Sequence, residues 1–461
     1  MLFNSTHFLI FLVLVVSINF TLNMAYRRYF LLISSYIFYW FWDVELSLLL
    51  VGSTVVDYIA ARVISSAPVG HNLRRIALFA SLVFNLGILI IFKYADFFSL
   101  TVSEMVGVTP WPMLDLVLPL GISFYTFQTM SYTIDVYRGK LSAFRDPVDV
   151  ALYVSFFPQL VAGPIIRADV LVPQIHKAHS LQPALIRAGI ALVVWGLCKK
   201  VFFADAMAPI VNEAYANPET MSGLALLTAT YAFAAQIYFD FSGYTDIAIG
   251  SALMLGITLP RNFDTPYLSL SIAEFWRRWH ISLSTWLRDY LYVSLGGNRK
   301  GSVRTYFNLL ITMVLGGLWH GAGWNWVVWG VFHGAILSLE RMIGLAHHRP
   351  RSIPVTVLRW FVTFHLVCIS WILFRAPDLE TAVTIMQRIL FWSEGFAFAP
   401  GWPVFIIALL LVVELTGLRA RWIAVIKASP RLALLVTLAA CALFPLVFRG
   451  TVNVEFIYFQ F

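Results

Sequence analysis

Long apolar stretches alternate with short polar segments along most of the chain. The stretches lie near residues 7–22, 29–42, 46–64, 76–92, 116–134, 183–202, 222–258, 305–319, 323–342, 355–374, 402–417 and 432–448. Only helices and closed barrels satisfy their backbone polar groups inside lipid, and a helix needs about 20 residues to cross it. The pattern therefore predicts an all-α, polytopic integral membrane protein with about 11–13 spanning helices.

Two segments depart from this regular spacing. The run 222–258 is too long for one untilted span and too short for two spans joined by a loop, so the pattern leaves both arrangements open. Segment 152–166 contains Pro158, Gly163 and Pro164, and proline and glycine interrupt helices. We expect this segment to be broken and re-entrant, with protein or water around its non-helical backbone.

The composition excludes a soluble protein. Apolar residues make up 60% of the 461 residues and charged residues 12%, against roughly 45–50% and about 25% in soluble domains. The net charge of +8 is explained by basic residues on one membrane face. The chain has no basic and aromatic nucleic-acid module, so we expect no nucleic-acid partner. Cys198, Cys368 and Cys441 lie far apart in apolar runs, which fits neither a disulfide framework nor a zinc site.

Basic residues cluster after alternate apolar runs. The clusters contain Arg27, Arg28, Arg62, Arg74, Arg75, Arg138, Lys140, Arg145, Arg341, Arg349, Arg351, Arg419, Arg421, Lys427 and Arg431. Basic loops stay on the cytoplasmic side, so this bias predicts that both termini lie outside. The first apolar run has no basic region before it and no cleavage site, so we expect a retained span. Without repeats or linkers, residues 1–461 are expected to form one domain with a C-terminal tail at 449–461.

Aromatic residues recur at helical spacing between residues 270 and 291. They are Trp276, Trp279, Trp286 and Tyr290, and the aliphatic residue Leu283 continues the same spacing. Spacings of three and four predict one amphipathic helix, and a helix rich in Trp and Arg commonly lies in the membrane interface. We expect these Trp residues to be interfacial anchors on the cytoplasmic side. His280 is expected at the edge of the stripe, with its imidazole facing a cavity.

His320 ends an apolar run among small and aromatic residues. Its neighbours are Gly316, Gly317, Trp319, Gly321, Gly323, Trp324 and Trp326. A histidine in a water-poor pocket suits a general base, whereas the alternative is a packed histidine bonded to a carbonyl group. His333 is a competitor, because it shares a helix face with Trp326 and Trp329. His320 and His333 are 13 positions apart with no acidic or cysteine ligand between them, so we expect no metal site.

Two further features are candidates for the site. Asp240 and Asp246 are six positions apart and are expected to brace the site or bind water rather than form an acid pair. The last six residues, 456–461, contain four aromatic residues. They are either an interfacial anchor or a tail that folds back, because the 13 residues from Arg449 onward reach roughly 40 Å when extended.

Several motifs together resemble the membrane-bound O-acyltransferase family, and its bacterial branch that modifies cell-surface polymers fits best. The strongest motifs are EFWRRWHISLSTWLRDYLY at 274–292, LGGN at 295–298 and LGGLWHG at 315–321. Further support comes from PLGISFY at 119–125, from segment 132–139, from FPQLVAGP at 157–164 and from segment 238–250. The resemblance covers residues 1 to about 375 and the C-terminal hexapeptide, and it is weak between 376 and 450.

The resemblance implies a fold with a tunnel that joins the two membrane faces. It implies that His320 is the essential histidine and His280 the second conserved histidine, whereas His333 matches no essential position. It also implies that Tyr458 is an acyl carrier. Candidates for donor binding or for the tunnel wall are Arg277, Arg278, Arg288, Asp240, Asp246 and Trp319. Arginine suits the donor's phosphates, although the positive-inside bias explains these cations equally well.

The implied reaction is acetyl transfer from cytoplasmic acetyl-CoA, with no bound cofactor, for O-acetylation of an exopolysaccharide such as alginate or cellulose. The implied location is the bacterial inner membrane, with both termini in the periplasm. The implied partners are a periplasmic SGNH-type acetyltransferase and a polysaccharide synthase complex. Two alternatives from other classes are a transporter or flippase of a polysaccharide precursor, which buried polar groups would suit, and a scaffold for a synthase.

Overall fold

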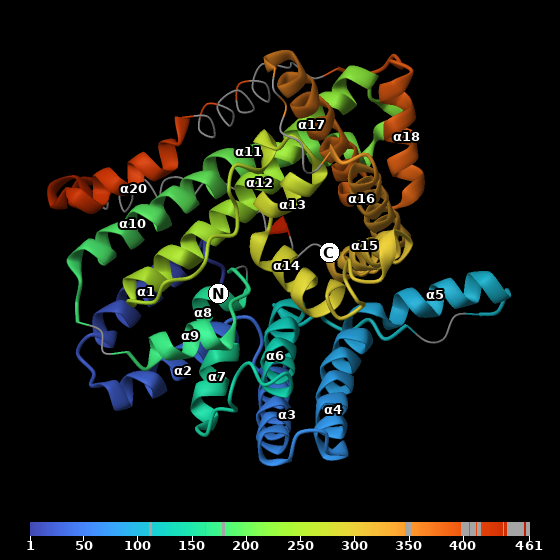
Figure 1. Cartoon of the computed structure of the whole chain (residues 1–461). Coiled ribbons are helices and arrows are strands. Elements are labelled where there is room, and N and C mark those ends of the chain that lie inside the picture. Colours follow the sequence, from blue (N-terminus) through green and yellow to red (C-terminus); the bar gives the residue numbers. More distant parts are fainter. Residues whose placement is uncertain are drawn as a thin grey trace. The chain divides into compact units, whose positions relative to one another are not determined.

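The computed structural model describes residues 1–461 except for 110–112, 162, 178–179, 346–349, 351, 398–404, 406–411, 413–415, 437, 440–455 and 458–461. Its regular structure is helical (Figure 1), as expected, and the described residues pair as strands only in one isolated bridge between Met221 and Phe396. The chain forms two compact units. The first contains Met1–Val193, Ile247–Pro260 and Lys427–Ala433, and the second contains Val194–Asp246, Arg261–Ile426 and Leu434–Phe461.

The first unit is built from the N-terminal helices. They are α1 (Thr6–Asn19), α2 (Met24–Trp40), α3 (Ser47–Ser66), α4 (Asn72–Leu89), the π-helix η1 (Ile90–Tyr94), α5 (Ala95–Val106), α6 (Ile122–Tyr137), α7 (Pro147–Ser155), α8 (Phe157–Leu160), α9 (Ala168–Ile175) and most of α10 (Pro183–Cys198). Helices α3, α4 and α6 lie side by side (Figure 1) around the buried carboxylate of Asp57. That carboxylate accepts hydrogen bonds from Ser81 Oγ, from Asn85 Nδ2 at 2.7 Å and from Thr133 Oγ1 at 2.7 Å. Buried polar groups need such partners.

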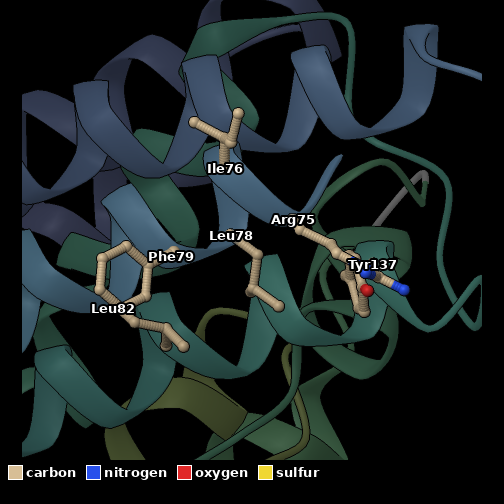
Figure 2. A pocket seen from close by; sticks show the side chains of 6 residues that line it. All are labelled: Arg75, Ile76, Leu78, Phe79, Leu82 and Tyr137. Atoms are coloured by element: carbon tan, nitrogen blue, oxygen red, sulfur yellow. The ribbon is translucent and has the colours of Figure 1, made fainter. Parts of the chain in front are cut away.

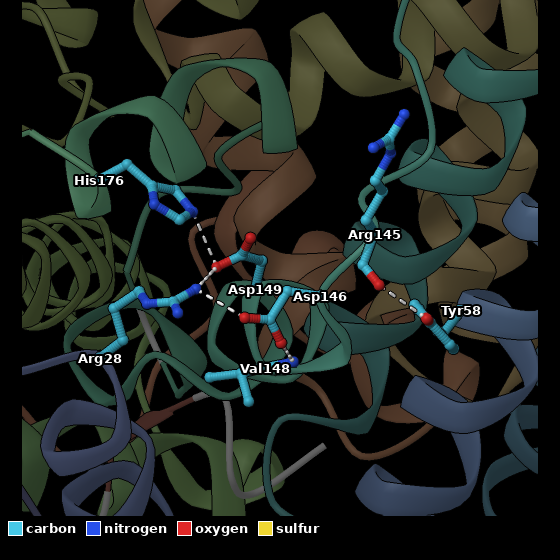
Figure 3. Close-up of polar contacts among 7 residues, drawn as sticks. All are labelled: Arg28, Tyr58, Arg145, Asp146, Val148, Asp149 and His176. Carbon is cyan, nitrogen blue, oxygen red and sulfur yellow. Dashed lines mark hydrogen bonds and ion pairs between the residues drawn. The ribbon is translucent and has the colours of Figure 1, made fainter. Parts of the chain in front are cut away.

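A charged cluster joins three helices of the first unit. Arg28 on α2 contacts Asp146 at 2.8 Å and Asp149 at 2.9 Å, at the start of α7. His176, directly after α9, places Nε2 2.9 Å from the same Asp149 carboxylate. Figure 3 shows the two carboxylates between Arg28 and His176. The cluster thus holds the chain on either side of the segment that was expected to be broken.

The predicted break is confirmed, whereas the re-entrant course of the segment stays a prediction. Helix α7 ends at Ser155, α8 has four residues, and Phe156 and Phe157 are fully buried. The backbone N–H of Phe157 donates to Ser35 Oγ at 3.1 Å. The irregular backbone is therefore surrounded by protein, as a membrane-embedded break requires.

An open apolar pocket of about 480 Å³ lies on the outer side of α4. It is lined by Arg75, Ile76, Leu78, Phe79, Leu82 and Tyr137. Figure 2 shows Arg75 and Tyr137 together at one end and the apolar side chains beside them. The lining residues include no histidine, cysteine or carboxylate that could act as a base or nucleophile. We therefore do not assign this pocket to the active site.

The second unit contains the motifs at 274–292, 295–298 and 315–321. Its elements are η2 (Lys199–Ala204), α11 (Asp205–Ala216), η3 (Pro218–Thr220), most of α12 (Gly223–Met254), η4 (Pro266–Leu268), α13 (Ile272–Arg278), α14 (Ile281–Trp286), η5 (Leu287–Tyr292), α15 (Gly301–His320), α16 (Trp324–Met342), α17 (Ile353–Arg375), α18 (Leu379–Leu390) and most of α20 (Leu418–Ala428). Run 222–258 is one helix of 32 residues, α12, which answers the question that the apolar pattern left open.

Four described helical segments are long and apolar enough to cross a membrane. They are Ser47–Ser66, Asn72–Val106, Gly223–Met254 and Ile353–Arg375. Helix Thr6–Asn19 is apolar but shorter. These segments support a membrane protein, whereas the total of spans and the orientation of the termini stay predictions.

The expected single amphipathic helix over 270–291 is wrong. Helix α13 ends at Arg278, and α14 begins at Ile281. Between them, His280 has a left-handed backbone with φ of 42°, and the N–H of Ile281 donates to the carbonyl of Asn262 at 2.9 Å. A partner outside the segment therefore satisfies the backbone where the helix breaks.

The break also overturns the expected interfacial role of two tryptophans. Trp279 is 1% exposed and Trp286 is 7% exposed. Trp279 packs at 5.0 Å between ring centroids from Trp371 and from Phe263. These side chains form part of the core of the second unit, because the break turns the stripe inward.

Candidate active site

His280 lies at the break between α13 and α14, and its side chain is fully buried. Its Nδ1 is 3.1 Å from Asn262 Oδ1. The same oxygen accepts hydrogen bonds from the backbone N–H of Ser282 at 3.1 Å and from the Ser282 hydroxyl at 2.9 Å. A backbone N–H only donates, so Asn262 presents its oxygen and His280 must donate from Nδ1. The neutral imidazole therefore keeps its lone pair on Nε2.

Burial sets the charge of this imidazole. Loss of water around the ring lowers the pKa of His280 from 6.5 to about 3. Phe241 packs edge-on against it at 4.7 Å between centroids. His280 is thus a neutral, oriented base at physiological pH, whereas the expected cavity beside its ring stays a prediction.

His320 is the last residue of α15 and is 5% exposed. Its ring lies between aromatic side chains, 5.2 Å from Phe374, 5.3 Å from Trp329 and 6.1 Å from Trp326 between centroids. Glycine makes this packing possible: a Cβ at Gly321 would collide with the indole nitrogen of Trp326. The glycine and aromatic residues expected around His320 therefore do surround its ring, whereas its role as a base stays a prediction.

Trp319 brings the two histidines into one cluster. Its ring is 5.0 Å from that of His320 and 6.1 Å from that of His280 between centroids. All three side chains are buried. The structure therefore joins His280, Trp319 and His320, three of the residues expected at the site.

His333 occupies a neighbouring place on α16. Its Nδ1 accepts a hydrogen bond from Trp276 Nε1 at 3.3 Å, and its ring is 4.6 Å from that of Trp329. Trp329 thus lies against both His320 and His333. The contact with Trp276 gives His333 a packing role, while the competition between the two histidines is still decided only by the resemblance.

Asp240 and Asp246 are held by two adjacent lysines that the sequence analysis did not single out. Lys199 Nζ is 2.7 Å from Asp246, and Lys200 Nζ is 2.8 Å from Asp240 and from Asp205. The lysines lie on the π-helix η2. Both lysines and the two aspartates Asp240 and Asp246 are buried, whereas Asp205 is partly exposed. A Lys-Lys pair inside the apolar run 183–202 was the available signal, because ionisable residues at membrane depth mark functional sites.

The C-terminal segment returns to this region. The backbone N–H of Ile457 donates to Asp240 Oδ2 at 2.7 Å. Phe456 is fully buried and packs 4.3 Å from Tyr244 and 5.7 Å from Phe241 between centroids. The fold-back alternative is therefore confirmed for these two residues, whereas Tyr458 lies outside the described part of the chain.

The three candidate arginines have different surroundings. Arg278 pairs with Glu274 at 2.8 Å and donates to Thr265 Oγ1 at 2.8 Å. Arg288 is exposed and pairs with Asp289 at 2.7 Å. Arg277 is exposed and forms no ion pair with a described residue. Arg277 is thus the cation of the three that is most accessible to a phosphate.

Metal chemistry has no obvious ligand set here. Among the described residues, no three His, Cys, Asp or Glu side chains are grouped so that they could hold an ion. Cys198 and Cys368 are free thiols, and Cys441 lies outside the described residues. The chemistry available in the described site is that of neutral imidazoles, hydroxyl groups and buried ion pairs.

Comparison with known proteins identifies this arrangement. The pattern of the membrane-bound O-acyltransferase family matches residues 145–375. "Probable alginate O-acetylase AlgI" of Pseudomonas aeruginosa is 44% identical over 387 residues, which cover 83% of this chain and 73% of that protein. "Peptidoglycan O-acetyltransferase" of Helicobacter pylori is 36% identical over 79% of this chain and 74% of its own length.

The name of a more distant relative describes the transfer of a different acyl group. "Teichoic acid D-alanyltransferase" of Bacillus subtilis is 28% identical over 58% of this chain and 71% of its own length. All three names describe acyl transfer, and the matches include both histidine-bearing motifs within residues 145–375. The chain therefore belongs to the membrane-bound O-acyltransferase family, and it is an O-acyltransferase.

Proposed function

We propose that the protein passes an acetyl group from cytoplasmic acetyl-CoA across a bacterial inner membrane, for O-acetylation of an exopolysaccharide such as alginate or cellulose. The observation that carries the proposal is the buried cluster of His280, Trp319 and His320. Two buried imidazoles among aromatic rings suit proton transfer away from water. The names of the relatives support an acetyl group and a polysaccharide acceptor.

In the proposed reaction, His320 acts as the general base. An acceptor hydroxyl oxygen attacks the carbonyl carbon of the acetyl thioester while His320 takes the hydroxyl proton. The carbon–sulfur bond breaks, and the leaving thiolate receives that proton from the imidazolium. The products are an O-acetyl ester and the free thiol of CoA. His280, oriented by Asn262, accepts a hydrogen bond at Nε2 from a water in the tunnel and so positions that water.

Two acceptors are proposed in sequence. The first is the hydroxyl of Tyr458, and its support is that Phe456 and Ile457, just before it, are held in the second unit next to Phe241. Phe241 also packs against His280. The second acceptor belongs to a periplasmic SGNH-type partner, which completes transfer to the sugar beside a polysaccharide synthase complex. Arg277 and the basic residues near it are proposed to bind the phosphates of CoA.

The test uses purified protein in lipid nanodiscs and acetyl-CoA labelled in the acetyl group. Release of acetyl from CoA is expected to be lost in the His320→Gln variant and retained in His365→Gln. His365 is the matched control because its imidazole, on α17, bonds to Tyr231 at 2.8 Å rather than to the cluster. Equal release by the two variants would contradict the proposed role of His320.

A further inference from the structure

Asp240 occupies an unusual position for a buried carboxylate. It lies on α12, is 2% exposed and touches both a lysine and the C-terminal segment. One oxygen, Oδ1, is 2.8 Å from Lys200 Nζ, while the other, Oδ2, accepts the backbone N–H of Ile457 at 2.7 Å. The two interactions use different oxygens, so they exist at the same time.

Lys200 makes this arrangement possible. A buried carboxylate without a countercharge is costly, and a paired carboxylate remains an acceptor. Lys200 is 1% exposed, and its ammonium also contacts Asp205 at 2.8 Å and lies over the ring of Tyr244 at 5.8 Å. Tyr244 is the ring that packs closest to Phe456. Lys200 therefore contacts both Asp240, which accepts the hydrogen bond from Ile457, and Tyr244, which packs against Phe456.

Phe456 fills that place. Its ring is fully buried, with Tyr244 and Phe241 on two sides. Burial of this ring removes apolar surface from water, which anchors the segment in addition to the single hydrogen bond from Ile457. Phe241 in turn touches His280 at 4.7 Å between centroids, so the segment is held one ring away from a proposed catalytic imidazole.

We propose that Asp240, paired with Lys200, is a positioning residue that fixes the C-terminal segment beside His280, with Phe456 as the apolar anchor. This role differs from the donor or tunnel contact expected for Asp240. It also differs from the role of Asp246, which pairs with the neighbouring lysine, Lys199, at 2.7 Å. Its importance for acyl transfer rests on the proposed function of Tyr458.

Hydrogen exchange measured by mass spectrometry tests the anchor without reference to activity. In full-length protein in nanodiscs, the Ile457 amide is expected to be protected. Asp240→Ala removes its acceptor, so exchange in the C-terminal peptide should rise about tenfold or more, because hydrogen bonds to charged groups are among the strongest. Asp240→Asn retains an acceptor oxygen and should raise exchange less. Asp246→Asn is the matched control, since it alters the other buried ion pair, and should leave this peptide protected.

Two outcomes would overturn the anchor: unchanged exchange in Asp240→Ala, or an equal rise in Asp246→Asn. Phe456→Ala guards against misfolding of the α12 variants, because it alters only the segment itself. It should raise exchange in the same peptide while the peptides of α12 stay as protected as in the parent. Unchanged exchange in Phe456→Ala would also contradict the proposal.

The same samples separate this proposal from the proposed function. If Asp240→Ala releases the peptide and Tyr458→Phe leaves acyl labelling of the protein intact, the anchor stands and acyl carriage by Tyr458 fails. If Tyr458→Phe abolishes the label and Asp240→Ala leaves the peptide protected, Tyr458 stands as the carrier and the anchor fails.

Discussion

The left-handed backbone at His280 brings a side chain into the core that a continuous helix would direct elsewhere. A non-glycine residue at positive φ is uncommon and costs about 1 kcal/mol or more. Asn262 offsets this cost: its carbonyl accepts the N–H of Ile281, and its side-chain oxygen accepts three further hydrogen bonds, among them the one from His280. Asn262 thus stabilises the break between α13 and α14 and sets both the orientation and the tautomer of the His280 imidazole.

Replacing Asn262 should therefore change catalysis through His280. Asn262→Asp places a carboxylate beside the imidazole, which favours its protonated form. Because neutral His280 is required, the acid limb of the pH–activity profile should move to higher pH, by about one unit or more. The measurement is the rate of acetyl release between pH 3 and 7, a range that includes the folded-state pKa of about 3. Asn262→Ala should lower the rate without that displacement, and identical profiles for all three proteins would argue against the assigned tautomer.

Burial of His280 also makes stability depend on pH. Its pKa is about 3 in the folded protein against an ordinary 6.5, so the unfolded chain binds a proton that the folded chain excludes. The stabilising contribution of the neutral ring is complete above pH 6.5 and is lost as the pH falls toward 3. Thermal midpoints measured between pH 7.5 and 5 should fall more steeply for the parent than for His280→Gln. Parallel slopes would contradict this burial.

At the scale of the helices, glycine determines how closely α10, η2 and α12 approach. A Cβ at Gly243 would lie 2.8 Å from the carbonyl oxygen of Gly196 and 3.3 Å from the backbone nitrogen of Lys200. Backbone atoms cannot rotate away, so any larger side chain must separate these elements. That separation would displace the lysine that pairs with Asp240.

Gly243→Val should therefore destabilise the protein by roughly 1–3 kcal/mol through overpacking. It should also reduce acetyl release, because Lys200 moves. Gly87→Ala, in α4, is the matched control: its added Cβ meets nothing within 4 Å, so the thermal midpoint should stay equal or rise slightly. Equal midpoints for Gly243→Val and the parent would show that the approach is looser than described.

The sequence predicted these elements unevenly. Apolar runs predicted helices, and Pro158 with Gly163 predicted the broken segment, because these signals are local. The break at His280 was missed because the periodic tryptophans continue across it, and its cause, Asn262, lies 18 positions earlier. The ion pairs were missed for the same reason, since Lys199 and Lys200 meet Asp246 and Asp240 from a separate helix.

At the scale of the whole molecule, composition predicted the class of protein and the motifs predicted the family. Composition was sufficient for a membrane protein, and the motifs at 274–292 and 315–321 were sufficient for the family. The meeting of His280 with His320 through Trp319 required folding, because 40 residues separate the histidines in the chain. The hydrogen bond from Ile457 to Asp240 spans 217 positions, and the aromatic C-terminus indicated a fold-back only as one of two alternatives.

Acyl carriage by the C-terminal segment is a prediction about the complete chain. After incubation with labelled acetyl-CoA, intact-protein mass spectrometry should detect one covalent acetyl group on the parent. Tyr458→Phe, which lacks the acceptor oxygen, should carry none. Tyr26→Phe is the control for non-specific labelling, because this phenol is 65% exposed. A label that persists in Tyr458→Phe would assign the C-terminal tyrosine an anchoring role only.

The central claim is that buried imidazoles carry the acyl transfer, and the rate of acetyl release from labelled acetyl-CoA by purified His320→Gln tests it most directly. Loss of a general base lowers rates by roughly 10²- to 10⁴-fold, and we predict a loss in this range with an unchanged thermal midpoint. Release at the parental rate by a folded His320→Gln protein would contradict the account.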